Sequence, residues 1–268
     1  LGSLYQGLDD SGKAKKTYEK LRAKYPDHEI VKLISINIVR AHLKIDDHDS
    51  AADALRTADF AEMNDESLRY LIISFVIEEA PRGMGRQTVE VCSTVAIKVI
   101  DELRPRYVKA KKDINRLHWL DYRKARSLYN LNKTSEAKSI LDIMVKEKPL
   151  GPYIFDVKYL LGAIAAKQKN YVTVGMIYGS LKGLSGRMPF DLNREVRISA
   201  EWASAYVGAE DASLLKKARG ISMMTKDSNV EKLNESGQIY VQKAGYLYIL
   251  YNKKMGVDIG KMKQAYLQ

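Results

Sequence analysis

Apolar residues recur along the chain with the three- and four-residue spacing of an amphipathic helix rather than with the alternation of a strand. Leu68, Leu71, Ile72, Phe75 and Val76 form one such stripe. The sequence has no Asn-Gly hairpin signal between alternating segments, and its runs of β-branched residues are short. The pattern therefore predicts an all-α chain.

Six prolines and several short polar stretches separate the periodic segments. Proline lacks an amide donor and clashes with the preceding turn, so each is expected near a helix end. Short loops favour antiparallel packing of neighbouring helices. The predicted helices span residues 1–8, 12–24, 28–44, 48–58, 65–80, 86–104, 106–131, 134–147, 152–168, 170–182, 190–208, 211–224, 230–253 and 257–267.

A recurring spacing of small and large residues then indicates internal repeats. The beginning of the chain has this spacing at Leu1, Gly2, Tyr5, Ala14, Tyr18 and Pro26. It resembles the second part of the tetratricopeptide repeat, with the opening of the first helix missing. A second copy has the same mutual spacing at Ala125, Leu128, Ala137, Leu141 and Pro149. A third has Leu161, Gly162, Ala165, Tyr171, Tyr178 and Leu181, with Val174 where the pattern prefers alanine, and Ala51, Leu55 and Ala58 fit a further second helix.

In this pattern the small residues let two paired helices approach closely, and the large residue that follows fills the gap to the next hairpin. The copies are unevenly spaced, and residues 65–105 and 190–268 match only as generic hairpins. The resemblance implies an irregular tetratricopeptide-like α-solenoid of about seven antiparallel helical hairpins, forming one superhelical domain over residues 1–268. Because Leu1 enters the pattern inside a repeat, we expect the native chain to continue N-terminally.

The charge of the chain is unevenly distributed. Residues 1–100 carry 14 Lys or Arg against 16 Asp or Glu, whereas residues 101–268 carry 30 against 17. The basic part predicts either a surface that attracts an acidic partner, phosphate or an anionic membrane, or a solvated lysine-rich helical surface. Its densest run is Arg104, Arg106, Tyr107, Lys109, Lys111, Lys112 and Arg116. On one continuous helix Arg106, Lys109 and Arg116 would share a face with Asp113, so nucleic acid is a less favoured partner than protein.

The sequence offers little catalytic chemistry. A single cysteine, Cys92, excludes an intramolecular disulfide framework and a thiolate zinc site, and its apolar neighbours predict a buried, inert thiol. The four histidines lack a metal-binding spacing, and no GxSxG motif is present. The apolar runs fall far short of the ~20 residues that span a bilayer. We therefore expect no enzyme activity, no cofactor, no metal and no transmembrane segment in this chain.

The candidate binding residues follow from the resemblance, because the first helix of each tetratricopeptide hairpin lines a concave groove. One stripe beside the packing residues of helix 106–131 holds Trp119, Tyr122, Arg126 and Tyr129, the residue types that dominate binding energy at interfaces. Corresponding places in the following hairpins are taken by Tyr159, Lys167, Arg194 and Arg197. We expect these side chains to be partly exposed on one concave side. The alternative is that Trp119 and Tyr122 belong to the core.

These features predict a non-enzymatic protein–protein interaction scaffold with a protein or peptide partner. Residues 18–26 resemble repeats of bacterial cell-envelope tetratricopeptide proteins, which implies a component of an envelope, secretion or motility machine in the periplasm or cell envelope. Three alternatives stay open: a cytoplasmic adaptor or co-chaperone-type module, a nucleic-acid- or polyanion-binding solenoid that uses residues 101–268, and a subunit of an enzyme whose active site lies elsewhere in a longer chain. The identity of the partner and the oligomeric state also stay open.

Overall fold

The computed structural model describes residues 10–25, 35–55, 58–78, 84–183 and 192–256, and every regular element in these ranges is a helix. The all-α prediction is confirmed. The helices are α2 (Ser11–Lys24), α4 (Ser35–Leu43), α5 (His48–Asp53), α6 (Asp65–Phe75), α7 (Arg86–Lys109), α8 (Ile114–Asn130), α9 (Thr134–Glu147), α10 (Ile154–Lys167), α11 (Tyr171–Gly183), α12 (Leu192–Ala205), α13 (Ala212–Lys226), the 3-10 helix η1 (Val230–Lys232) and α14 (Glu235–Lys254). The predicted helices 1–8 and 257–267 lie outside the described residues.

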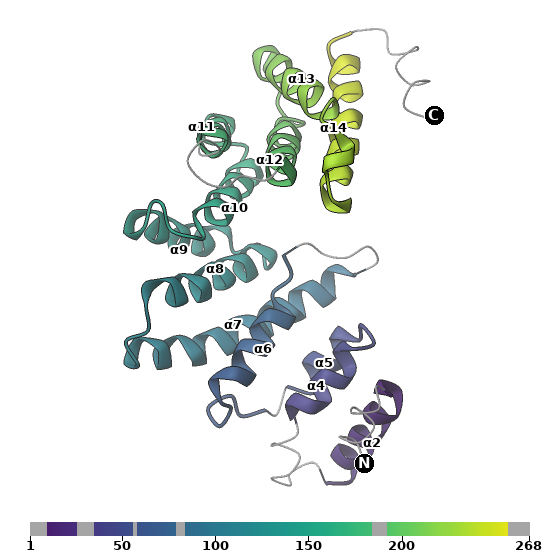
Figure 1. The fold of residues 1–268 in the computed structure, drawn as a ribbon, viewed down its shortest axis with the longest axis vertical. Coiled ribbons are helices and arrows are strands. Elements are labelled where there is room, and N and C mark those ends of the chain that lie inside the picture. Colours follow the sequence, from purple (N-terminus) through teal and green to yellow (C-terminus); the bar gives the residue numbers. More distant parts are fainter. Residues whose placement is uncertain (1–9, 26–34, 56–57, 79–83, 184–191, 257–268) are drawn as a thin grey trace. The chain divides into compact units, whose positions relative to one another are not determined.

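The chain divides into two compact units, Leu1–Met144 and Val145–Gln268. In unit 1, α4 packs on α5 and α6 packs on α7, while α2 contacts α4 and α8 contacts α7. In unit 2, α10 packs on α11 and α12 on α13, with α14 against both α12 and α13 (Figure 1). Each unit therefore has the sequential pairing of a helical-repeat solenoid. That the whole chain forms one superhelical domain stays a prediction.

Four helix junctions share one backbone geometry. Each places a non-glycine residue in the left-handed region, and these residues are Asp46, Lys111, Asn132 and Lys169. At the end of α8, the amide of Asn132 donates to the carbonyl of Tyr129 and the amide of Lys133 donates to that of Leu128. This pair of hydrogen bonds satisfies carbonyls that a helix end leaves open. In three of the four junctions the next helix begins two residues later, which produces a tight hairpin.

The small residues of the repeat pattern lie where helices approach closely. A Cβ added to Gly162 of α10 would lie 2.6 Å from the ring of Tyr178 in α11, so only glycine fits there without movement. The side chains of Ala14, Ala51 and Ala137 are fully buried. The large residues Tyr18, Leu55, Leu141 and Tyr178 are also buried. The packing assigned to these positions from the sequence is confirmed.

The predicted helix break at Pro105 is wrong. Helix α7 continues through Pro105 to Lys109, and α8 begins at Ile114. A proline inside a helix costs about 3 kcal/mol, but two contacts hold the last turns of α7 in place. Tyr107 is buried in the core of unit 1, and the Arg106 guanidinium donates to the carbonyls of Met63, Phe60 and Ala61 at 2.6, 3.0 and 2.7 Å.

The helix break instead lies between Lys109 and Ile114, and this position changes the geometry of the basic run. Arg106 and Lys109 belong to α7, whereas Asp113 caps α8 and Arg116 lies in its first turn. The four residues therefore do not share one helix face as expected. The predicted helix 65–80 is also too long, because α6 ends at Phe75 and Val76 adopts an extended conformation.

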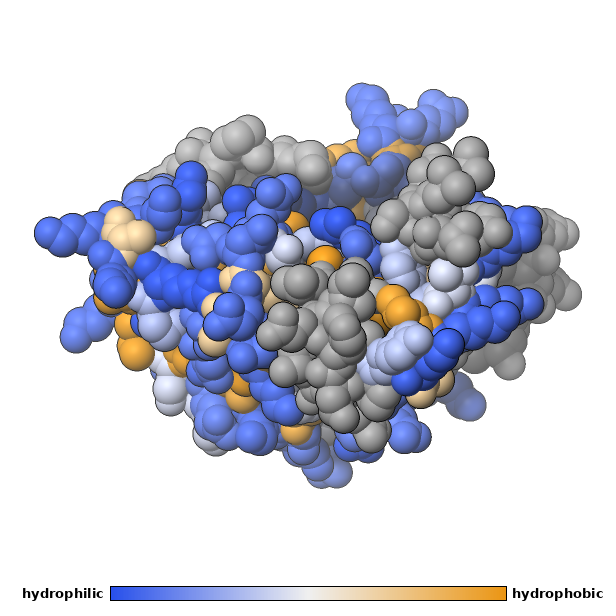
Figure 2. Space-filling model, turned by 90° about the horizontal axis from the view of Figure 1, so that it is seen from below, coloured by the Kyte–Doolittle hydropathy of each residue, from blue (hydrophilic) through white to orange (hydrophobic). Residues whose placement is uncertain are grey.

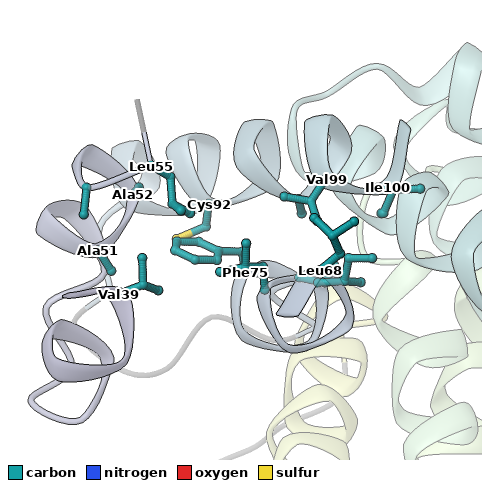
Figure 3. Packing of buried hydrophobic residues seen from close by; sticks show 14 of the residues in the cluster. Val39, Ala51, Ala52, Leu55, Leu68, Phe75, Cys92, Val99 and Ile100 are labelled. Carbon is teal, nitrogen blue, oxygen red and sulfur yellow. The ribbon is translucent and has the colours of Figure 1, made fainter. Parts of the chain in front are cut away.

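The core of unit 1 lies between α4, α5, α6 and α7, and Figure 3 shows Val39, Ala51, Leu55 and Phe75 pointing into it. Cys92 of α7 belongs to the same cluster and is fully buried. Burial, with a smaller contribution from the charge of Asp49, raises the pKa of the Cys92 thiol to about 12. The prediction of a buried thiol is confirmed, and the raised pKa favours the thiol over the reactive thiolate.

A polar cluster joins α2 to the turn between α4 and α5. The Asp47 carboxylate accepts hydrogen bonds from Lys15 Nζ at 2.7 Å and the Ser50 amide at 3.1 Å, and it lies 3.2 Å from Nδ1 of the buried His42. Burial opposes the charge of Asp47, but the hydrogen bonds from Lys15, Ser50 and His42 outweigh it and hold the pKa of this carboxyl well below its usual range. The ionised form of Asp47 thus stabilises the contact between α2 and the turn that joins α4 to α5.

Replacing Gly162 by alanine tests the register of the repeat. Because the new methyl group meets the Tyr178 ring, we expect Gly162→Ala to lower the free energy of unfolding by about 1–3 kcal/mol. The matched control is Gly220→Ala in α13, where an added Cβ meets nothing within 4 Å. That change is expected to raise stability by up to about 1 kcal/mol, the ordinary helix preference for alanine. The register would be contradicted if urea denaturation showed that both substitutions change the free energy of unfolding in the same direction.

The depressed pKa of Asp47 predicts a pH dependence. A carboxyl whose pKa is lower in the folded state contributes stability above the unfolded-state pKa of about 3.9 and loses it as the pH falls. We expect Asp47→Asn to reduce the loss of stability between about pH 5 and pH 3, relative to the wild type. The control is Glu62→Gln at an exposed loop carboxylate. Equal acid sensitivity of Asp47→Asn and the wild type in denaturant melts would contradict this role.

Candidate partner-binding faces

Arginine side chains stack on aromatic rings between the first helices of successive hairpins. In unit 1 these helices are α4, α6 and α8. The Arg40 guanidinium of α4 lies 4.9 Å from the ring centroid of Tyr70 in α6, and that of Arg69 in α6 lies 5.9 Å from the ring of Trp119 in α8. Each contact of this kind contributes about 0.5–2 kcal/mol, depending on its exposure to water.

Unit 2 has the same arrangement between α10, α12 and α14. The Arg197 guanidinium of α12 lies 4.4 Å from the ring of Tyr159 in α10 and 5.8 Å from that of Tyr240 in α14. Arg194, one turn earlier in α12, lies 5.1 Å from the ring of Phe155. In both units, arginine–aromatic contacts therefore connect helices that are separated by one other α-helix along the chain.

In unit 1 the predicted binding stripe of α8 contacts its own chain. Trp119 lies between two guanidinium groups, those of Arg69 and Arg123, and packs against the core cluster. Tyr122 is buried, with 7% of its surface exposed, and its hydroxyl donates to the Glu78 carboxylate at 2.8 Å. The expectation of partial exposure is wrong for Tyr122. The reason is that the predicted helix 65–80 ends early, so that the following segment covers α8.

Four side chains of α8 bind residues 77 and 78, and we call them the α8 clamp: Tyr122, Arg123, Arg126 and Asn130. Arg123 lies 3.0 Å from the Glu78 carboxylate, and Arg126 lies 3.7 Å from it. Asn130 Nδ2 donates to the Ile77 carbonyl at 2.8 Å, and Arg126 Nε donates to the same oxygen at 3.4 Å. Arg126 also stacks on Tyr129, with 5.6 Å to the ring centroid.

In unit 2 the structure brings together Tyr159, Arg194 and Arg197 of the predicted site. Two residues of α14 complete this group. The sequence pattern favoured packing over a binding role for Tyr240, which is buried, and did not single out Lys243. Lys243 lies 6.0 Å from the Tyr240 ring centroid and donates to Glu201 at 2.6 Å. We call Tyr159, Arg194, Arg197, Tyr240 and Lys243 the α12 face. Lys167 lies in the last turn of α10, eight residues after Tyr159, or about 12 Å along the helix axis.

The predicted site residues of α8 belong to unit 1, and the others belong to unit 2. That all eight line one concave groove stays a prediction. Figure 2 shows a face of the molecule on which hydrophilic side chains predominate and apolar residues appear as separate spots.

Part of the basic run stabilises the fold. Arg104 binds Asp121 with two hydrogen bonds, of 2.6 and 3.1 Å, and Arg106 holds the loop before α6. Tyr107, the aromatic residue within the run, is buried and therefore does not stack on a base. The exposed members of the run are Lys109, Lys111, Lys112 and Arg116, the last of which lies 3.7 Å from Asp113.

Among the described residues, no group of three or more histidine, cysteine, aspartate or glutamate side chains is arranged to hold a metal ion. No described helix combines the length and the apolar character needed to cross a membrane.

Comparison with known families gives a match at the beginning of the chain. Residues 1–28 match the family model of the tetratricopeptide repeat. Within this range the structure describes most of α2, where Ala14 and Tyr18 are buried. No curated protein matches the chain. Tetratricopeptide arrays are helical solenoids whose concave surfaces generally bind other proteins.

A double-mutant cycle tests the contact between the α8 clamp and Glu78. Tyr122→Phe removes the hydroxyl donor, and Glu78→Gln removes the charge of the acceptor. Because the two groups share one part-buried hydrogen bond, we expect a coupling free energy of about 1 kcal/mol in urea denaturation. The control is the exposed pair Lys138 and Asp142, one turn apart on α9, with an expected coupling of about 0.3–0.5 kcal/mol. Additive effects of Tyr122→Phe and Glu78→Gln would contradict the contact.

Proposed function

We propose that this protein is a non-enzymatic scaffold that binds a segment of another protein along the first helices of its hairpins. The match to the tetratricopeptide repeat supports this class of function. The observation that carries the proposal is the α12 face, where arginine, lysine and tyrosine side chains from α10, α12 and α14 lie together. Tyrosine and arginine are the residue types over-represented among residues that dominate binding energy.

The charge of unit 2 favours an acidic partner. Residues 145–268 carry 19 Lys or Arg against 11 Asp or Glu. Arg194 is exposed, while Arg197 is held between Tyr159 and Tyr240. A guanidinium fixed on an aromatic ring loses little side-chain entropy when it binds a carboxylate, because its orientation is already set. The α12 face therefore suits a carboxylate-bearing protein segment.

At a finer level, we propose a role in a bacterial envelope, secretion or motility machine, with the chain in the periplasm or cell envelope. The resemblance of residues 18–26 to repeats of envelope proteins supports this assignment. A cytoplasmic adaptor is the alternative. Fractionation of native cells with an antibody against the chain separates the two: recovery with the periplasmic or envelope fraction is expected, and recovery in the cytosolic fraction would favour the adaptor.

The test of the proposed function is a charge reversal on the α12 face. Tagged wild-type protein and Arg194→Glu are used to capture partners from the native cell, and each partner is then purified and titrated by calorimetry. We expect Arg194→Glu to weaken the binding of the partner at least about tenfold, because it places like charges across the interface. Thermal melting of each variant checks that the fold is retained.

Lys216→Glu is the matched control, since Lys216 is exposed on the second helix α13 and the net charge of unit 2 changes equally. It is expected to change the affinity less than about twofold. Equal losses in both variants, with steep salt dependence, would indicate a polyanion bound by overall charge. No loss in Arg194→Glu would show that the α12 face is not the binding surface.

A further inference from the structure

The α8 clamp binds its own chain with the features of a peptide-recognition site. Two of its groups, Asn130 and Arg126, contact a backbone carbonyl, that of Ile77. Tyr122 and Arg123 contact the carboxylate of the next residue, Glu78. Contacts to the backbone fix the position of a bound segment, and contacts to a side chain select its sequence.

The bound segment leaves the helix and is anchored by apolar side chains. Helix α6 ends at Phe75, and Val76 is extended, with φ −81° and ψ 105°. Val76 and Ile77 are buried and belong to the core cluster of unit 1. The clamp thus binds the carbonyl of Ile77 and the carboxylate of Glu78 in a non-helical segment whose two preceding apolar side chains are buried.

The clamp has more donor capacity than this segment uses. Two arginines, Arg123 and Arg126, lie near the single carboxylate of Glu78, and 38% of the Glu78 side chain is exposed. The Nε atom of Arg123 is buried without a hydrogen-bond partner. A buried donor that lacks an acceptor is costly, so a ligand that supplied one more acceptor would be favoured over the present occupant.

We propose that the α8 clamp is a binding site for non-helical acidic peptide segments. Residues 76–78 occupy it within the chain, and a segment of a partner protein can replace them. The ligand class is an apolar–apolar–glutamate sequence. Residues 76–78 compete at the effective concentration of a tethered segment, on the order of millimolar. The apparent affinity for an external segment therefore equals the intrinsic affinity multiplied by the fraction of clamps that are open.

The test compares peptide binding to the wild type and to Glu78→Gln, which keeps the shape of the internal segment but removes its charge. The probe is the peptide acetyl-Ala-Val-Ile-Glu-Ala-amide. The chain has two tryptophans, Trp119 beside the clamp in unit 1 and Trp202 in unit 2, so their indole N–H signals in NMR spectra report separately on the site and on the other unit. We expect the peptide to shift the Trp119 signal alone, and to bind Glu78→Gln at least about tenfold more tightly than the wild type.

Two controls distinguish the clamp from general attraction. The peptide with glutamine in place of glutamate is expected to bind Glu78→Gln at least about tenfold more weakly, and Arg123→Gln in the Glu78→Gln background is expected to lose binding of the glutamate peptide. If melting shows that Glu78→Gln loses the fold, Glu78→Asp replaces it, since the shorter side chain withdraws the carboxylate but keeps its charge. Equal binding of the two peptides, equal shifts of both indole signals, or no shift of Trp119 in the folded variant would overturn the proposal.

Discussion

The close approach of paired helices at small residues is the constraint on which the rest of the structure depends. At Gly162 the Tyr178 ring occupies the space that a Cβ would fill, and alanines at corresponding positions are fully buried. This packing buries much of the apolar surface between neighbouring helices, while a few apolar side chains such as Ile73 and Val172 stay exposed. On the first helices α4, α6, α8, α10 and α12, arginine, tyrosine and tryptophan side chains make contacts from one first helix to the next.

These arginine–aromatic contacts connect the fold to the proposed function. A guanidinium placed over a ring keeps its charge and its hydrogen-bond donors, so the same side chain can stabilise two helices and bind a carboxylate. Arg123 combines a ring contact with carboxylate binding within unit 1: it lies 5.8 Å from the ring of Trp119, on the same helix, and 3.0 Å from the Glu78 carboxylate. On α12, Arg197 has the first of these roles through Tyr159 and Tyr240, and the second is what the proposed function assigns to this face.

Local pattern predicted most of the helices and the close contacts between them, because apolar periodicity and small residues act over a few turns. Contacts between distant residues were not predictable in this way. Helix α7 passes Pro105 because Arg106 binds carbonyls more than 40 residues earlier in the chain. The early end of α6 had a local signal, since β-branched Val76 and Ile77 precede Glu78 and lower the preference for helix. Tyr240 and Lys243 belong to the α12 face because α14 packs on α12, a contact that a local pattern does not reveal.

The stripe on α8 shows why a sequence pattern identifies a binding chemistry more readily than a binding partner. Tyrosine, arginine and asparagine at helical spacing indicate a face that accepts carbonyl and carboxylate groups, and the α8 clamp does accept them. The groups come from Ile77 and Glu78, 53 residues before Asn130 and 44 residues before Tyr122. Whether such a face binds its own chain or another protein depends on where α6 ends, because a helix that continued past Phe75 would carry Glu78 away from α8. The same face thus supports the fold while its chemistry suits the acidic segments that the proposal assigns to it. The balance between these roles is set by how firmly residues 76–78 are held.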